Sequence, residues 1–154
     1  MKFLVFLMIL FALPGLAKRA LACSCAFYRT PLEMLALSDA VFTGTLTDIK
    51  EVDQGSGIVL LGTFTLVDCW KGTLPTQILV TTPLSSAACG VAFFPGTDYL
   101  VYATGEINSL WTGQCMRTGQ LSGAQEDISE LGSPKSTPVL PVSWSRIRQW
   151  YPQQ

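Results

Sequence analysis

An alternation of apolar and polar residues in the first half of the chain predicts β-structure. Over residues 40–49, Phe42 and Leu46 fall on one face of the alternation and threonines fall on the other, which is typical of a half-buried strand. A turn-forming run rich in glycine and polar residues follows at 53–57. The next strand, over 58–70, is therefore expected to return beside the first strand as a hairpin.

Further apolar stretches predict three more strands, with a helix on each side of the strand region. The first helix is expected to begin at Thr30-Pro31-Leu32-Glu33, which is a capping box with proline at the first helical position. This helix is expected to turn Met34, Leu35 and Leu37 toward the core. The remaining strands are expected at 77–82, 98–103 and 110–112.

The second helix is expected after the last strand. Ser122 and Gln125 form another capping box, and Gly132 is expected to end the helix. Its acidic residues could be taken for a paired-carboxylate site, but we interpret them as a solvated helix face: Glu126, Asp127 and Glu130.

Five short strands with one helix before and one after them fit an all-β fold, a small five-stranded Greek-key barrel of the OB type. An immunoglobulin-like sandwich is the alternative, but that fold requires about seven strands. The sequence contains no internal repeat and no sign of a second domain. Four aromatic residues are expected in the barrel core rather than on a binding platform: Phe93, Phe94, Tyr99 and Tyr102.

The two ends of the chain differ from the domain in composition. Residues 1–22 have a positively charged start, an apolar core and small residues at Ala20 and Ala22, which together predict a secretory signal peptide cleaved before Cys23. Their apolar core is shorter than the roughly 20 residues that span a bilayer, and no later segment approaches that length. The domain is then expected over 23–132. Residues 133–154 form a tail rich in proline and serine, interpreted as a flexible extension or as a strip laid on the barrel.

The composition excludes several classes of function. The leader contains Lys2, Lys18 and Arg19, so its removal leaves 7 of the 10 basic residues against 11 acidic residues, a net charge of −4. Nucleic-acid binding is not expected, because its affinity depends on neutralising phosphates. The sequence has no histidine, which excludes Ser-His-Asp and Cys-His catalysis and histidine-ligated zinc. We expect a secreted monomer, extracellular or periplasmic, that is neither an enzyme nor a cofactor-binding protein.

Five cysteines in an exported chain indicate a disulfide framework with one thiol left over. Cys23 and Cys25 form a Cys-x-Cys pair directly after the expected cleavage site. A bond between these two would be strained, so each is expected to reach a distant partner. Four paired cysteines allow three connectivities, and the residues alone do not choose among them. Cys69 is in phase with Val67 on the second predicted strand and is expected to be a small buried residue.

A Cys-x-Cys pair can also serve in thiol redox chemistry. Reactive thiols need a lowered pKa and electropositive surroundings, and the sequence does not obviously supply either. A lipid anchor on Cys23 is another alternative. Lipid-attachment sites usually carry leucine three residues before the cysteine, and this chain has Ala20 there.

The ordered cysteines and their neighbours resemble the tissue inhibitors of metalloproteinases and their netrin-like relatives over nearly the whole mature domain. The resemblance begins at Cys23-Ser24-Cys25 and continues through four further motifs and a last cysteine: Ser38-Asp39-Ala40-Val41-Phe42, Trp70-Lys71-Gly72, Ser85-Ser86-Ala87-Ala88-Cys89-Gly90-Val91, Asp98-Tyr99-Leu100-Val101 and Cys115. The chain departs from the family pattern because it lacks the third disulfide of this domain and the second, cysteine-rich domain.

The resemblance implies an OB-type barrel and a specific pairing of cysteines. The first mature cysteine of the family bonds to the cysteine of the inhibitory loop, which here implies Cys23 with Cys89. The third mature residue bonds to the later cysteine, which implies Cys25 with Cys115. Cys69 has no counterpart in the family and is left free.

The resemblance also implies a function, the inhibition of zinc metalloproteases. The α-amine and carbonyl of Cys23 would chelate the catalytic zinc of the target protease, and Ser24 would point into the specificity pocket beside that metal. Ser86, Ala87 and Ala88 would form the neighbouring contact ridge. The alternative function is a secreted OB-fold binding or adhesion module of the cell envelope that inhibits nothing.

Overall fold

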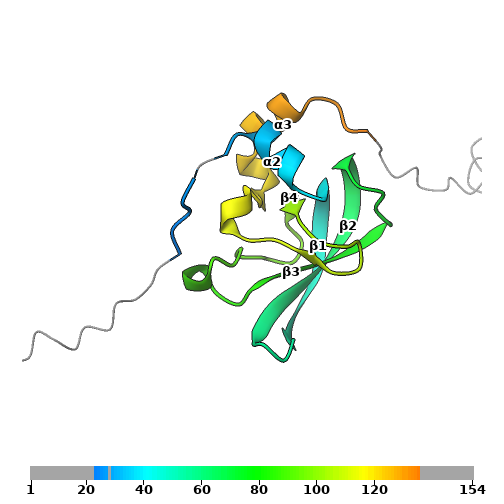
Figure 1. The fold of residues 1–154 in the computed structure, drawn as a ribbon. Coiled ribbons are helices and arrows are strands. Elements are labelled where there is room, and N and C mark those ends of the chain that lie inside the picture. The colour runs from blue at the N-terminus through cyan, green and yellow to red at the C-terminus, as the bar shows by residue number, and fades with distance from the viewer. Residues whose placement is uncertain (1–22, 28, 136–154) are drawn as a thin grey trace, which may run out of the picture.

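The computed structural model describes residues 23–27 and 29–135, so the expected signal peptide and most of the tail lie outside the described residues. The fold is mixed: a six-stranded, mostly antiparallel open sheet with two short α-helices (Figure 1). The strand order is β5-β3-β2-β1-β4-β6. The main elements are α2 (Pro31–Leu37), β1 (Ala40–Asp53), β2 (Ile58–Lys71), β3 (Gln77–Pro83), β4 (Asp98–Ala103), β5 (Leu110–Trp111), β6 (Gly119–Gln120) and α3 (Gln125–Leu131).

The predicted hairpin is confirmed, and its strands are longer than expected. β1 and β2 pair antiparallel from Val41–Lys71 to Asp53–Ile58. The turn between them is held by the Asp53 carboxylate, which accepts a hydrogen bond from the Gly55 backbone N–H at 2.8 Å. Gly55 has a φ of 79°, a conformation that glycine adopts without steric cost. The hairpin forms the centre of the sheet and carries its longest ladder.

The expected number of strands was too low. The sheet has six strands rather than five, because the two-residue strand β6 pairs antiparallel with β4 and was not foreseen. The short strand predicted at 110–112 is β5, which pairs parallel with β3. Within the described residues the strand ladders do not close into a barrel, although an isolated antiparallel bridge joins Thr104, just after β4, to Trp111.

A β-bulge in β2 overturns the expected phase of Cys69. In the ladder with β1, Thr43 is opposite Asp68 and Gly44 is opposite Leu66, so Val67 has no opposing residue. The extra residue reverses the inward and outward alternation beyond it. Val67 is 44% exposed while Cys69 is buried. The predicted burial of Cys69 is confirmed, but the prediction that Cys69 lies on the same face as Val67 is wrong.

The two helices lie together at one end of the sheet (Figure 1). The capping box of α2 is confirmed: the Thr30 hydroxyl accepts from the Glu33 N–H, and the Glu33 carboxylate accepts from the Thr30 N–H. Met34 is buried and Leu35 packs partly against the core, but Leu37 is 53% exposed, contrary to expectation. The helix has only seven residues, and Leu37 occupies its last, outward position.

The second capping box is wrong. Ser122 lies in a 3₁₀ turn, η3 (Leu121–Gly123), and α3 starts after Ala124 with no side-chain cap. Gly132, with a φ of 66°, follows the helix as predicted. The acidic residues of α3 were also misassigned in part, because Asp127 is buried whereas Glu126 and Glu130 are exposed.

Two clusters of buried side chains form the core, one against each face of the sheet region. Phe64 is the centre of the first cluster, where its ring makes edge-to-face contacts with three aromatic rings at centroid distances of 5.2 to 6.0 Å: Phe42, Phe93 and Tyr99. The second cluster packs beneath the helices and includes Met34, Trp70 and Tyr102. Three of the four aromatic residues expected in the core are therefore buried, while Phe94 is 56% exposed.

No helix of the described residues is long and apolar enough to cross a membrane.

Candidate functional site

The cysteine pairing implied by the resemblance is present in the structure. Cys23 bonds to Cys89 and Cys25 bonds to Cys115, with Cα–Cα distances of 5.0 and 5.3 Å. Cys69 is free and buried. The two disulfides fasten residues 23–27, which we call the N-terminal strap, to two loops that come from distant parts of the chain.

The loop that carries Cys89 is folded tightly on itself. It contains a 3₁₀ turn, η1 (Ser86–Ala88), and the Gly90 N–H closes it with a 2.9 Å hydrogen bond to the Ser85 carbonyl. The Val91 N–H donates to the Thr82 hydroxyl at 2.9 Å and anchors the loop to β3. A Cβ on Gly90 would lie 2.0 Å from the Pro83 carbonyl oxygen, so only glycine fits at this close approach. The loop is consequently a preformed feature of the surface.

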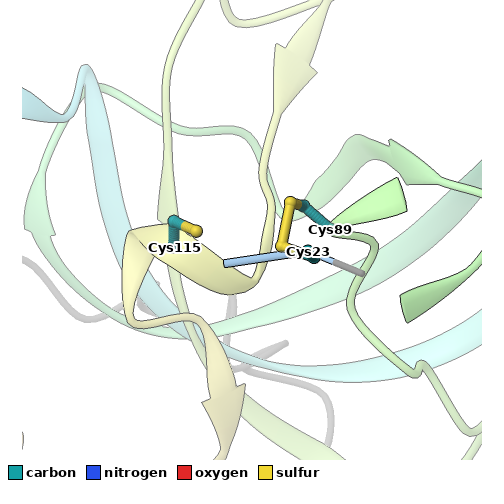
Figure 2. A group of neighbouring side chains, drawn as sticks. All are labelled: Cys23, Cys89 and Cys115. Carbon is teal, nitrogen blue, oxygen red and sulfur yellow. A yellow bond between two sulfur atoms is a disulfide. The ribbon is translucent and has the colours of Figure 1, made fainter. Parts of the chain in front are cut away.

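The two disulfide-bearing loops are directly joined. The Gln114 N–H donates to the Cys89 carbonyl at 2.8 Å, which brings the turn η2 (Gln114–Met116) against the Cys89 loop. Figure 2 shows the Cys115 sulfur beside the Cys23–Cys89 bond, and the Sγ atoms of these three cysteines lie within 4.8 Å of one another. All three sulfurs are oxidised in disulfides, so none is a thiolate that could bind a metal.

An ion pair between Arg117 and Asp127 connects the Cys115 loop to helix α3. Arg117 has a φ of 62° and contacts Asp127 through two hydrogen bonds, from Nε at 2.8 Å and from Nη2 at 2.6 Å. Its Nη1 donates to the Arg29 carbonyl at 2.8 Å, just beyond the strap. The Tyr102 hydroxyl donates to the same Asp127 carboxylate at 2.9 Å. The network therefore connects the chain after the strap, the Cys115 loop, helix α3 and strand β4.

Contacts within this network shift the pKa values of Asp127, Arg117 and Tyr102. Burial alone would raise the pKa of the Asp127 carboxyl, but hydrogen bonds from Arg117 and Tyr102 outweigh burial and hold that pKa below its usual range. The hydrogen bond to Asp127 raises the pKa of Arg117. Burial, followed by the bond to Asp127, raises the pKa of the Tyr102 hydroxyl. The pair is ionised across the physiological range.

The predicted contact residues are on the surface. Ser24 is exposed between the two anchored cysteines of the strap, and the proposed ridge is exposed along the whole of η1: Ser86, Ala87 and Ala88. The Cys23–Cys89 bond brings the first strap residue to the end of this ridge. Two apolar residues that were not predicted as contacts are also exposed here, Phe27 on the strap (75%) and Leu84 before the ridge (44%).

Sequence reasoning missed the Arg117–Asp127 pair. Its only sequence signal is an acidic residue in the first turn of a helix, where a carboxylate is common for other reasons. Asp127 was taken for a solvated residue because the sequence does not show that Arg117 turns back toward it.

No family model matches the chain, and no curated protein matches its sequence. The resemblance to the metalloproteinase inhibitors therefore rests on the motifs and the spacing of the cysteines.

We predict that Cys69 is the one cysteine that reacts with an alkylating reagent, and only after unfolding. Its side chain is 1% exposed and its Sγ is 3.2 Å from the Lys71 carbonyl oxygen, so reagent cannot reach it in the native state. Peptide mapping without reduction, on protein labelled before and after denaturation, should recover Cys23–Cys89, Cys25–Cys115 and late-labelled Cys69. Recovery of Cys69 in a disulfide would contradict the structure.

A second prediction concerns the pH dependence of stability. Because the pKa of Asp127 is lowered on folding, its ionised form stabilises the protein above the unfolded value near 3.9, and this stabilisation is lost as the pH falls through the folded pKa. Asp127→Asn should cost about 2–3 kcal/mol at pH 7, and the cost should shrink below about pH 4. Urea unfolding of both proteins from pH 7 to pH 2 measures this.

The matched control is Glu126→Gln, which removes a charge from an exposed neighbour in the same helical turn and should change stability by less than about 0.5 kcal/mol. A cost for Asp127→Asn that stays constant down to pH 2 would show that the carboxylate charge does not stabilise the fold.

Proposed function

We propose that this protein is a secreted inhibitor of zinc metalloproteases that binds through its own first mature residue. The observation that carries the proposal is the Cys23–Cys89 disulfide, which fastens the residue expected at the mature N-terminus beside the exposed turn η1. An N-terminal residue held at such a point presents an α-amine and a carbonyl together. These two groups form a bidentate ligand for a metal.

The chemistry of a protease zinc suits this ligand. Catalytic zinc keeps an open coordination position that is normally filled by water. An α-amine has a pKa near 8 and can lose its proton on binding a metal. The amine and carbonyl of Cys23 would displace the water and leave the protease without its nucleophile. The zinc belongs to the target, and the inhibitor itself has no cofactor.

The surroundings of Cys23 supply the remaining contacts. Ser24 is exposed and would enter the specificity pocket beside the metal, while Ser86, Ala87 and Ala88 would lie along the cleft. The strap is held by two disulfides and the ridge by its own hydrogen bonds. A site ordered before binding avoids much of the entropy loss that a flexible peptide would meet.

We also infer that the sheet curves into an OB-type barrel, although its ladders alone leave it open. Ladders connect β5, β3, β2, β1 and β4 in that order, and the Thr104–Trp111 bridge is where β4 and β5 would meet. Both backbone hydrogen bonds of that bridge are short, 2.9 and 2.8 Å. These contacts support closure of β1 to β5 into one barrel, with β6 as an added edge strand.

Secretion is part of the proposal. Two disulfides are typical of proteins in oxidising compartments, outside the cell or in the periplasm. The expected signal peptide before Cys23 lies outside the described residues.

The proposal predicts that one extra residue before Cys23 abolishes inhibition. A protein with alanine added at the N-terminus keeps both disulfides and should unfold at nearly the same temperature, but its amine is displaced from the metal. The inhibition constant against a panel of zinc metalloproteases should rise by about 100-fold or more. Ser24→Arg should weaken binding to shallow specificity pockets more than to deep ones, whereas Ser56→Arg, in the exposed hairpin turn, should have no effect.

Equal inhibition by the native and alanine-extended proteins would exclude chelation by Cys23. Absence of inhibition by correctly processed native protein across the panel would favour the alternative, a non-inhibitory binding or adhesion module.

A further inference from the structure

An apolar groove lies between strand β2 and helix α3, away from the disulfides. Its volume is about 540 Å³. Val67 and Trp70 form the β2 wall, and Leu121 of η3 and Ile128 of α3 form the opposite wall. Figure 1 shows α3 at the end of the sheet where β2 ends, with the chain passing over the end of β2 as it leaves the helix. No element of the described chain fills this groove.

Val67 gives the groove an exposed apolar side chain. It follows the buried Leu66 and lies on the outward side of β2, where its side chain is 44% exposed although valine favours burial. The neighbouring Trp70 is 4% exposed and its indole N–H donates to the Gly132 carbonyl at 2.8 Å. This bond fixes the end of α3 against β2, so the groove is a preformed feature of the fold.

The chain itself leaves the described fold along the rim of this groove. Gly132 and Pro134 are among the residues that line it. The Lys135 N–H then donates to the Cys69 carbonyl at 2.8 Å, which holds the start of the tail beside β2. Residues 136–154 therefore begin next to the groove, and a few residues suffice to reach any part of it.

The composition of residues 136–154 matches the groove. The segment has Val139, Leu140, Val142 and Trp144 close to its start, and this is an unusual density of apolar side chains for a solvated tail. It also carries Arg146 and Arg148 but no acidic side chain. Glu126 and Glu130 of α3 are exposed but are not among the residues that line the groove. The match between the segment and the groove is therefore one of apolar side chains.

We propose that residues 139–144 of the tail fold back and occupy the groove between β2 and α3 of the same chain. An intramolecular segment starts at a high effective concentration, so modest contacts suffice to hold it. Docking would bury the exposed side chain of Val67 and cover the groove. The inference is independent of the proposed inhibition, because it uses no residue of the strap or of η1.

A double-mutant cycle on the full mature chain tests the proposal. One variant, Val67→Lys, places a charge in the groove. The other changes Val139, Leu140, Val142 and Trp144 to serine. If the tail occupies the groove, the two changes are coupled, and the unfolding constant of the combined variant should differ about threefold or more from the product of the separate effects. The matched control is Leu79→Lys on β3, a residue 43% exposed like Val67 but outside the groove, and it should combine with the tail variant additively.

Sedimentation velocity at low and high protein concentration distinguishes the possible occupants. Coupling at Val67 but not at Leu79, in a protein that stays monomeric, supports the proposal. Additive effects at both positions overturn it. Coupling that appears only where a dimer forms also overturns it, in favour of a second copy of the chain as the occupant.

If Val67→Lys does not fold, hydrogen exchange replaces the cycle. Backbone amides of β2 and α3 around the groove should exchange about threefold or more faster in the tail variant than in the native protein. Unchanged exchange there would overturn the proposal.

Discussion

The candidate site depends on the covalent bond between Cys23 and Cys89. Ser24 and Phe27 are exposed, so packing does little to position the strap. The disulfide instead closes a loop with a sequence separation of 66 residues, which in the chain-entropy model is worth about 4 kcal/mol. It places Cys23, the first residue of the proposed mature chain, at the end of the turn η1. The second bond, Cys25 to Cys115, fixes the direction in which the strap leaves that point.

The rest of the fold serves as a rigid base for these two bonds. The Gln114 N–H to Cys89 carbonyl bond joins the two loops, so the disulfides move together. Arg117 and Asp127 extend the same unit into α3 and, through Tyr102, into the core. In the proposed mechanism this rigidity lowers the entropy cost of binding, because the groups that would contact the target are already ordered. The groove between β2 and α3 is lined by none of these residues and can take part in a separate interaction.

The sequence predicted best where short-range patterns decide the structure. The alternation around Phe42, the turn at Gly55 and the cap at Thr30 depend on neighbours within a few residues, and all three are confirmed. The prediction failed where a distant segment decides. The bulge at Val67 exists only in the register of β2 with β1, and the burial of Asp127 requires Arg117 to turn back from another loop.

The candidate site also has features that could be predicted from short-range patterns and features that depend on distant segments. The residues alone left three disulfide connectivities open, and only the likeness of the ordered motifs to a family selected one of them. The two-residue strands β5 and β6 carry too few residues for a periodic signal, so their pairing partners could not be read from the sequence. The exposed ridge was identified from its motif, but its rigidity follows from Gly90 and its contact with Pro83, which only the structure shows.

The central claim is that Cys23 is the first residue of the working protein and that its amine is free. Intact-mass measurement of the exported protein tests it most directly. We expect the mass of the chain without residues 1–22, less the four hydrogens lost in two disulfides, and after reduction and alkylation the first Edman cycle should release Cys23. A chain that keeps any residue before Cys23, or an acyl group on Cys23, would block the amine and contradict this claim.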